Sequence, residues 1–236
     1  MTIGAVLDEA WTLYTRFFGR FFLLGLVVFA IVNLAYALLV EAIANDSAGA
    51  AAALGILGLA TAIIGTTWLQ GAFVYAVQDA RDGSFDSSLR DVFVRVSPAV
   101  LPLLVAGLLA GLGIALGFVL FIVPGLFLLT IWAVIGPVIV VERTGALDAF
   151  GRSRELVRGH GWTVFAIVLI TGLLSGIASG ILQAAFSFLP RFLEILVGGT
   201  IAQAVVAPFV ATALAITYFR LDEAHGVPAE DAAAET

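Results

Sequence analysis

Residues 122–162 read IVPGLFLLTIWAVIGPVIVVERTGALDAFGRSRELVRGHGW, and this stretch decides the fold. It opens with Pro124-Gly125 inside apolar sequence, continues without a charge to Val141, and changes at Glu142 to a segment that carries several arginines. A long apolar run is typical of a membrane-spanning helix, and an amphipathic segment with arginines is typical of a helix at the membrane surface. The stretch therefore predicts a span that ends at a charged surface helix.

The composition extends this prediction to the whole chain. Hydrophobic residues make up 61% of the sequence, charged residues only 12%, and the mean hydropathy is +1.11. Ordinary soluble domains carry about 25% charged residues, so the chain is predicted to be an integral membrane protein. A span needs about 20 apolar residues, so the 236 residues have room for several spans. The absence of cysteine excludes disulfides, thiolate nucleophiles and zinc sites with cysteine ligands.

Six apolar runs predict six spans, at about residues 21–40, 49–77, 98–121, 125–141, 161–187 and 195–219. The first run has the form of a leader peptide that ends near Ala37, but the acids Asp8 and Glu9 before it favour an uncleaved span. Pro124-Gly125 predicts the turn between the third and fourth spans. Gly136-Pro137 predicts a kink in the fourth span, because proline removes a helix hydrogen bond. That span is short, so a partly re-entrant path is the alternative to a full crossing.

Three further segments place their apolar residues at helical spacing, with charges mostly on the other side, at residues 3–18, 84–96 and 145–159. Each precedes a pair of spans. The predicted fold is thus an all-α integral membrane protein with six transmembrane helices as three hairpins, each preceded by an amphipathic interfacial helix on the cytoplasmic side. Residues 1–220 form this single membrane domain, and residues 221–236 are predicted to be an acidic, disordered tail.

The arginines set the expected orientation. The chain has 11 basic residues, all arginine, and in the six-span arrangement only Arg191 lies on the opposite side from the rest. Because basic residues accumulate on the cytoplasmic side, we expect a multi-pass protein of the cell membrane with both termini in the cytoplasm.

The central stretch resembles a bacterial and archaeal membrane family named for the membrane domain of certain glycerophosphoryl diester phosphodiesterases. The resemblance rests on a proline-glycine pair, a tryptophan and a proline in the following span, a glutamate at its exit, and an Ala-x-x-x-Ser-x-x-Leu helix: Pro124, Gly125, Trp132, Pro137, Glu142, Ala149, Ser153 and Leu156. In the namesakes a separate soluble domain performs catalysis, and no such domain is present in this sequence. The resemblance therefore implies a stand-alone membrane protein of a largely uncharacterised family.

The span centres contain no charged residue, and their polar residues are amides and hydroxyls. Gln70, Gln183 and Gln203 are candidates for a polar path through the membrane, and hydrogen bonding between helices is the alternative role. Glycines four residues apart, such as Gly113 and Gly117, predict close packing of helices.

Arg143, Arg152, Arg154 and Arg158 form a candidate surface for anionic lipid head groups or a protein partner. The alternative is that these arginines only set the topology. We expect membrane lipids, and a protein partner or a second copy of the chain, as partners, and no nucleic acid.

No catalytic constellation is visible. Asp79, Asp82, Asp86 and Asp91 cluster in sequence beside arginines, as in a solvated loop, and His160 and His225 lack metal-ligand spacing. We therefore expect no cofactor and no metal. The leading hypothesis is a non-enzymatic protein that organises the membrane, interacts with lipid or recruits a partner. The alternatives are a small transporter or flippase for an amphiphile, and a membrane accessory to phosphodiester or lipid metabolism.

Overall fold

The computed structural model describes residues 1–81 and 89–226, and every regular element in these ranges is helical. The elements are α1 (Ile3–Arg16), α2 (Phe18–Ala44), α3 (Ala48–Arg81), α4 (Leu89–Leu120), α5 (Ile122–Ile131), α6 (Ile135–Glu142), α7 (Ala146–Val157), α8 (Gly161–Ala185), α9 (Arg191–Leu193), the π-helix η1 (Glu194–Gly199) and α10 (Thr200–Gly226). Within the described residues, six helical stretches are long and apolar enough to cross a membrane: Phe18–Ala44, Ala48–Arg81, Val94–Leu120, Ile122–Glu142, Gly161–Ala185 and Arg191–Gly226. The predicted all-helical, multi-pass membrane class is therefore confirmed.

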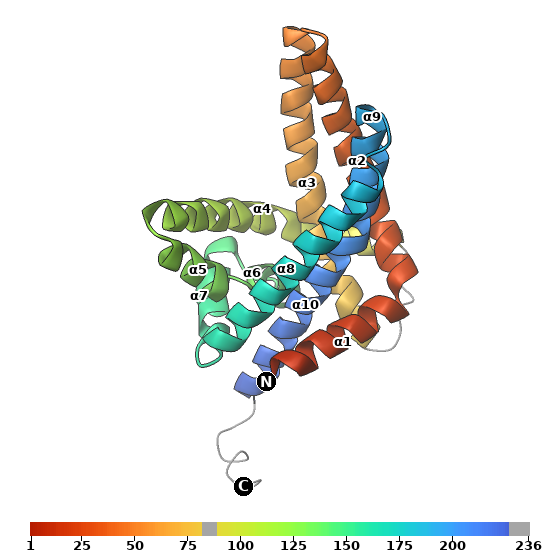
Figure 1. The fold of residues 1–236 in the computed structure, drawn as a ribbon. Helices are drawn as coiled ribbons and strands as arrows, with labels where there is room; N and C mark the ends of the chain where they lie inside the picture. The colour runs from red at the N-terminus through yellow and green to blue at the C-terminus, as the bar shows by residue number, and fades with distance from the viewer. Residues whose placement is uncertain (82–88, 227–236) are drawn as a thin grey trace, which may run out of the picture.

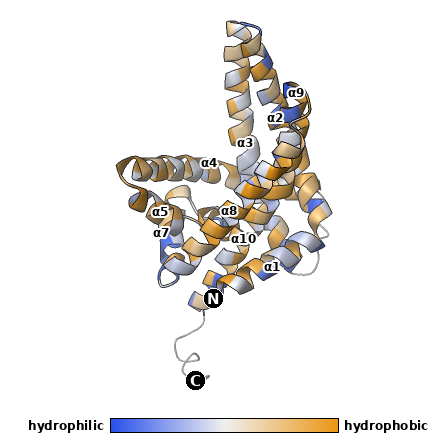
Figure 2. Ribbon diagram, viewed as in Figure 1, coloured by the Kyte–Doolittle hydropathy of each residue, from blue (hydrophilic) through white to orange (hydrophobic). Residues whose placement is uncertain are grey.

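The long helices do not form one parallel bundle. Figure 1 shows α2 and α3 side by side, extending past the other helices, while α8 and α10 run diagonally beside each other. In the same view α4 lies crosswise to α3, and α1 lies at the end away from the α2–α3 connection. The apolar colouring follows these long helices, whereas α7 and parts of α1 are hydrophilic (Figure 2).

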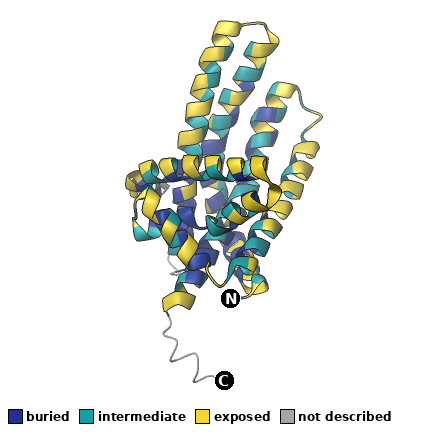
Figure 3. Cartoon of the chain, turned by 90° about the vertical axis from the view of Figure 1, so that its left-hand side faces the viewer, coloured by how far each residue is buried: buried dark blue, intermediate teal, exposed yellow. Residues whose placement is uncertain are grey.

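The core is concentrated at the end of the molecule where α1, α6, α7 and the last turns of α3 and α10 meet. Its buried residues come from all of these elements, and include Ala10, Tyr75, Ile139, Leu156 and Leu221. Figure 3 shows this buried region below the more exposed halves of α2 and α3 that lie nearest their connection. Large apolar side chains remain exposed on those two helices, for example Ile56 at 74%. Such side chains are stable when they face lipid instead of water.

Residues 84–96 were expected to form a surface helix separate from the third span. Residues 84–88 lie outside the described part of the chain, and from Leu89 onward the helix continues into the span as α4. Pro98 and Pro102 lie inside this helix. Each proline lacks the N–H that would bond to the carbonyl four residues before it, so the helix continues with two backbone hydrogen bonds missing.

The fourth span differs from the prediction in two places. The chain reverses at Phe121, whose φ of −162° and ψ of 156° are extended, and Pro124-Gly125 lies inside α5, so the predicted turn at that pair is wrong. Proline is tolerated there because the first turn of a helix has unpaired N–H groups in any case. The predicted kink at Gly136-Pro137 is found earlier, at residues 132–134, between α5 and α6. The ring of Pro137 would clash with the carbonyl four residues before it, which is that of Ala133.

The C-terminal helix is longer than predicted. α10 extends to Gly226, so residues 221–226 of the predicted disordered tail are helical. Leu221 is fully buried in the core, and Asp222 and Glu223 form ion pairs with other helices. These contacts stabilise the last turns of the helix. The rest of the predicted tail, 227–236, lies outside the described residues.

Candidate functional site

The arginines expected to form one lipid surface are separated by the structure into two groups. Arg152 points toward α6 and α10, where its Nε lies 3.0 Å from Glu142 at the end of α6 and its Nη2 lies 2.9 Å from Asp222 of α10. A third, longer contact of 3.5 Å joins it to Glu155 on its own helix. The buried hydroxyl of Tyr218 donates a hydrogen bond of 3.0 Å to the same oxygen of Glu142. Arg152 therefore joins α6, α7 and α10.

The electrostatics of this cluster keep Arg152 charged. Burial alone would lower the pKa of Arg152, but the hydrogen bond and charge of Glu142, together with the charge of Asp222, raise the pKa above its ordinary value. The side chain is 31% exposed, so these ion pairs are partly screened by solvent. Arg152 is occupied by contacts within the chain and has a structural role.

Arg143, Arg154 and Arg158 are exposed, and no acid among the described residues lies within ion-pair distance of them. Arg143 ends α6 in the left-handed region, with φ of 53°. Arg154 and Arg158 lie at the C-terminal end of α7, beside the start of α8. The candidate lipid surface is therefore reduced to these three arginines, because Arg152 is occupied by ion pairs within the chain.

A second group of ion pairs was not predicted. Glu9 of α1 accepts hydrogen bonds of 2.9 and 2.6 Å from Arg220 of α10 and lies 3.2 Å from Arg81 of α3. Arg81 also contacts Glu223 at 2.8 Å. The partners are distant in sequence, so no spacing rule connects them. The predicted six-span arrangement puts these arginines and Glu9 at the same side of the bundle, and this was the only signal in the sequence that could have suggested the pairing.

The acidic cluster considered for catalysis is spread out in the part of the chain that the structure describes. Asp79 pairs with Arg95 at 3.1 Å, and the guanidinium of Arg95 lies 4.6 Å from the ring centre of Tyr75. Asp91 lies in the first turn of α4, and Asp82 and Asp86 fall outside the described ranges. Among residues 1–81 and 89–226, no group of three side chains is arranged to hold a metal ion.

The residues of the family-like pattern gather around the break in the fourth span. Because α5 ends at Ile131, its last carbonyls lose their helical partners, and the fully buried hydroxyl of Ser153 donates a hydrogen bond of 2.8 Å to the Ile131 carbonyl. The Trp132 ring packs edge-on against Phe150 of α7, with ring centres 4.9 Å apart. Together with the Glu142–Arg152 ion pair, these contacts hold α7 against α5 and α6.

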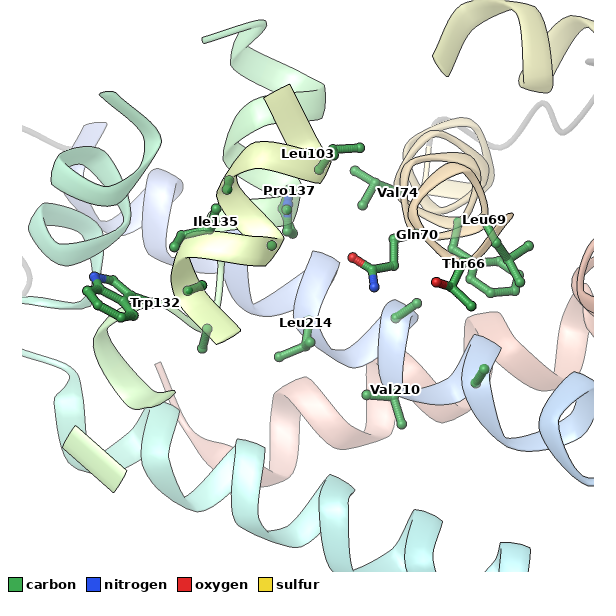
Figure 4. Close-up of a pocket in the computed structure, with 18 of the residues that line it drawn as sticks. Thr66, Leu69, Gln70, Val74, Leu103, Trp132, Ile135, Pro137, Val210 and Leu214 are labelled. Atoms are coloured by element: carbon green, nitrogen blue, oxygen red, sulfur yellow. The ribbon is translucent and has the colours of Figure 1, made fainter. Parts of the chain in front are cut away.

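A cavity of about 530 Å³ lies between α3, α4, α6 and α10, next to this break. Its wall is almost entirely apolar, with Leu69, Leu103 and Leu214 among the lining residues. Gln70 and Thr66 extend toward it from α3, as Figure 4 shows. The Thr66 hydroxyl donates to the Ala62 carbonyl of its own helix, whereas the Gln70 amide has no hydrogen-bond partner among the described residues.

The other two candidate glutamines line a second cavity of about 540 Å³, between α2, α3, α8, η1 and α10. Gln183 and Gln203 share it with Asn33, Arg191 and Glu194. The π-helix η1 forms part of this wall, and π-helical segments occur often at functional sites. The predicted polar path is therefore divided between two cavities.

The two cavities follow each other along the same helices. Phe29 and Ala207 line the first cavity, and Asn33 and Gln203, one turn away on α2 and α10, line the second. Phe29 is buried, with 6% of the residue exposed. One helical turn of packed side chains thus separates the two spaces.

Comparison of the chain with protein-family models, with curated proteins and with solved structures finds no match.

Proposed function

We propose that this chain is a non-enzymatic multi-pass membrane protein that binds a lipid or a similar amphiphile. One observation carries the proposal, which is the cavity beside the broken fourth span, where the exposed amide of Gln70 and the hydroxyl of Thr66 lie in a wall that is mainly apolar. Its volume falls in the range of about 300–1,000 Å³ that is usual for small-molecule sites. An apolar chain would contact the leucines of the wall, and a polar group on the same molecule would hydrogen-bond to Gln70.

The chemistry of the wall favours an amphiphile over an ion. None of the residues that line the cavity is charged. An ion would need several polar ligands to replace its hydration shell, and the lining residues supply only Gln70, Thr66 and the indole N–H of Trp132. A neutral polar group attached to an apolar body needs only one or two hydrogen bonds, which an amide can supply.

The proposed topology has three hairpins of spans with both termini in the cytoplasm, and α1 and α7 are the amphipathic helices at the cytoplasmic surface of the cell membrane. Before the second hairpin the described segment is the start of α4 itself. The arginine distribution supports this orientation. α1 supports the surface role of the first such helix, because it buries Val6, Ala10 and Leu13 and exposes Asp8 and Arg16. The family-like pattern around Trp132 and Ser153 supports a relative of the phosphodiesterase membrane domain, so an accessory role in lipid metabolism is compatible with lipid binding.

The experiment that tests the binding proposal compares lipids that remain bound after purification in a non-ionic detergent. Gln70→Leu should reduce the amount of co-purified amphiphile about fivefold, because a hydrogen bond contributes about 1 kcal/mol. Gly107→Leu should reduce it further, because Gly107 lines the cavity and a side chain there has open space to fill. Gln203→Leu, in the second cavity, is the matched control. Equal retention by all variants, measured by mass spectrometry of the extracted lipids, would refute the proposal.

Transport of the amphiphile is the second candidate, and the two cavities one helical turn apart favour it. In liposomes that contain a fluorescent phospholipid, Phe29→Ala should speed movement of the lipid between leaflets, because it removes the large side chain at the boundary between the cavities. The control is Phe22→Ala on the same helix, since Phe22 lines neither cavity. A wild-type rate equal to that of protein-free liposomes would rule out transport and leave binding as the function.

A further inference from the structure

A groove runs between α5, the C-terminal end of α7 and the first turns of α8. It has two adjoining parts, of about 580 and 680 Å³, which share Phe127, Ile131, Gly159 and Gly161. The part toward α8 is mainly apolar, with Trp162 and Phe165 in its wall. The part toward α7 contains Arg154 and Arg158. One end of the groove therefore offers cations and the other offers an apolar surface.

The charge at the α7 end is positive overall. Arg154 and Arg158 are exposed, and no described acid pairs with them. Glu155 also lines this part of the groove, so two guanidinium groups face one carboxylate and one net positive charge remains. Two guanidinium groups are thus available to an anion, and a guanidinium binds phosphate with two parallel hydrogen bonds.

The start of α8 adds unpaired donors to the same place. α8 is 25 residues long, begins at Gly161, and has no side-chain hydrogen bond that caps its N-terminus. The first backbone N–H groups of a helix have no partner within it, and they attract anions through the helix dipole. This helix end lies in the wall of the groove, since Gly161, Trp162 and Thr163 all line it.

Backbone geometry keeps the groove open. Gly159 connects α7 to α8 with φ of 88°, a conformation that L side chains rarely adopt, and a Cβ added there would meet nothing within 4 Å. Gly151 and Gly161, which also line the groove, leave open space in the same way. Three glycines without packing partners in the described chain therefore provide room for a ligand.

We propose that this groove binds one anionic phospholipid, with its phosphate held by Arg154 and Arg158 and an acyl chain lying between α5 and α8. The inference rests on the proposed membrane placement, which puts α7 at the cytoplasmic surface. Charge complementarity selects an anionic head group, and the apolar half selects a molecule with an acyl chain. Trp162, at 84% exposure, lies where interfacial tryptophans anchor proteins to the head-group layer. The site is separate from the cavity that contains Gln70.

The test measures lipid binding by native mass spectrometry of the full chain in a non-ionic detergent, with phosphatidylglycerol, phosphatidylcholine or inorganic phosphate added separately. The wild type should retain one phosphatidylglycerol and bind it in preference to phosphatidylcholine. The double variant Arg154→Gln/Arg158→Gln should bind phosphatidylglycerol about thirtyfold more weakly, from about 1 kcal/mol for each arginine near the surface. Its affinity for phosphatidylcholine should fall much less, because the choline of that head group already balances the charge of the phosphate.

Two further variants separate the parts of the proposal. Gly151→Leu leaves both arginines in place and fills the groove, so it should weaken the binding of both lipids to a similar extent. Arg143→Asn removes an exposed arginine that does not line the groove, and it should have no effect; asparagine tolerates the left-handed backbone at this position. Each variant is first checked for an unchanged melting temperature in detergent alone.

Three results would overturn the proposal. Phosphatidylglycerol binding that is unchanged in the double variant would show that the two arginines do not hold the phosphate. An equal loss in Arg143→Asn would indicate diffuse surface charge instead of a site. If inorganic phosphate bound as tightly as the lipid, the acyl chain would contribute nothing to the affinity. Gln70→Leu should leave this binding intact, so failure of the central-cavity proposal and failure of this one are distinguishable.

Discussion

Substitution of Arg152 by methionine should destabilise the fold, although the neighbouring arginines of α7 are dispensable for it. Methionine keeps the length and apolar stem of the side chain but removes the hydrogen bonds to Glu142 and Asp222, which lie 3.0 and 2.9 Å from the guanidinium. The carboxylate of Glu142, whose side chain is 24% exposed, would then retain the hydroxyl of Tyr218 as its partner. Three helices would lose their shared ion pair.

The expected loss follows from the exposure of the partners. A hydrogen bond to a charged group contributes about 1.5–3 kcal/mol when buried, and an exposed ion pair contributes about 0–1 kcal/mol. The Arg152 side chain is 31% exposed and Asp222 is 48% exposed, so the cluster lies between these limits. We expect Arg152→Met to lower the free energy of unfolding by about 1–2 kcal/mol. Glu142→Gln combined with it should cost less than the sum of the single changes, because the two residues share one interaction.

The assay is reversible unfolding in a non-ionic detergent without added phospholipid, followed by the fluorescence of tryptophan. Omitting lipid matters because ligand binding would itself shift the apparent stability. Arg154→Met is the matched control, with the same chemical change on the same helix at an exposed site, and it should remain within about 0.5 kcal/mol of the wild type. Equal losses for Arg152→Met and Arg154→Met, or strictly additive effects of Arg152→Met and Glu142→Gln, would refute the structural role of Arg152.

Further predictions concern packing, ionisation and topology. Gly117→Ala should destabilise the fold by about 1–3 kcal/mol in the same unfolding assay, because its Cβ would lie 2.9 Å from the backbone of α5, while Gly107→Ala should be neutral; similar effects would contradict this. Tyr14→Phe should cost about 1 kcal/mol near pH 7 through loss of the bond to a backbone carbonyl of α10. Burial raises the pKa of Tyr14, so its neutral side chain stabilises the fold below its ordinary pKa of about 10, and this stabilisation is lost as the pH rises further. Tyr14→Phe should therefore lose less stability than the wild type as the pH rises above about 10. An equal loss of stability in both proteins over that range would contradict this prediction. Reporters fused at the three predicted outer connections, at Asp46, Phe121 and Arg191, should be active outside the cytoplasm. A cytoplasmic signal at any of the three would contradict the six-span arrangement.

Hydropathy was sufficient to predict the number and approximate limits of the spans. The first apolar run was predicted at residues 21–40, and the helix extends from Phe18 to Ala44. This works because apolar segments leave water whatever their neighbours are. The path of α4 across α3 could not be predicted in the same way, since lipid is as apolar as leucine and provides no direction for packing one helix on another.

Close packing depends on which face of a helix meets a neighbour, and the spacing of glycines alone does not predict which face that is. Gly113 and Gly117 face the Trp132 ring and the backbone of Gly125, as the four-residue spacing predicted. Gly172 and Gly176 have the same spacing on α8, yet a Cβ at either would meet nothing within 4 Å. The same glycine spacing is therefore packed against a neighbour in α4 and open in α8, and residues far away in the chain decide which of the two occurs.

The candidate site was predicted in part for a related reason. The sequence grouped four arginines by their position after the fourth span, but the direction of each depends on the rotation of α7. At about 100° per residue, Arg154 and Arg158 lie about 200° and 240° from Arg152, which places them together on the opposite side. The contact of Ser153 with the Ile131 carbonyl helps to fix this rotation, because its hydroxyl must reach the broken end of α5.

This geometry gives the two sides of α7 separate tasks. With Arg152 held by Glu142 and Asp222, the helix cannot rotate without breaking two ion pairs, so Arg154 and Arg158 remain directed at the groove. Substitution of Arg152 should therefore alter lipid binding and stability together, while substitution of Arg154 and Arg158 should alter lipid binding with stability intact. A helix anchored on one side presents its other side in a fixed orientation, which is what a stoichiometric lipid site requires and a diffuse basic surface does not.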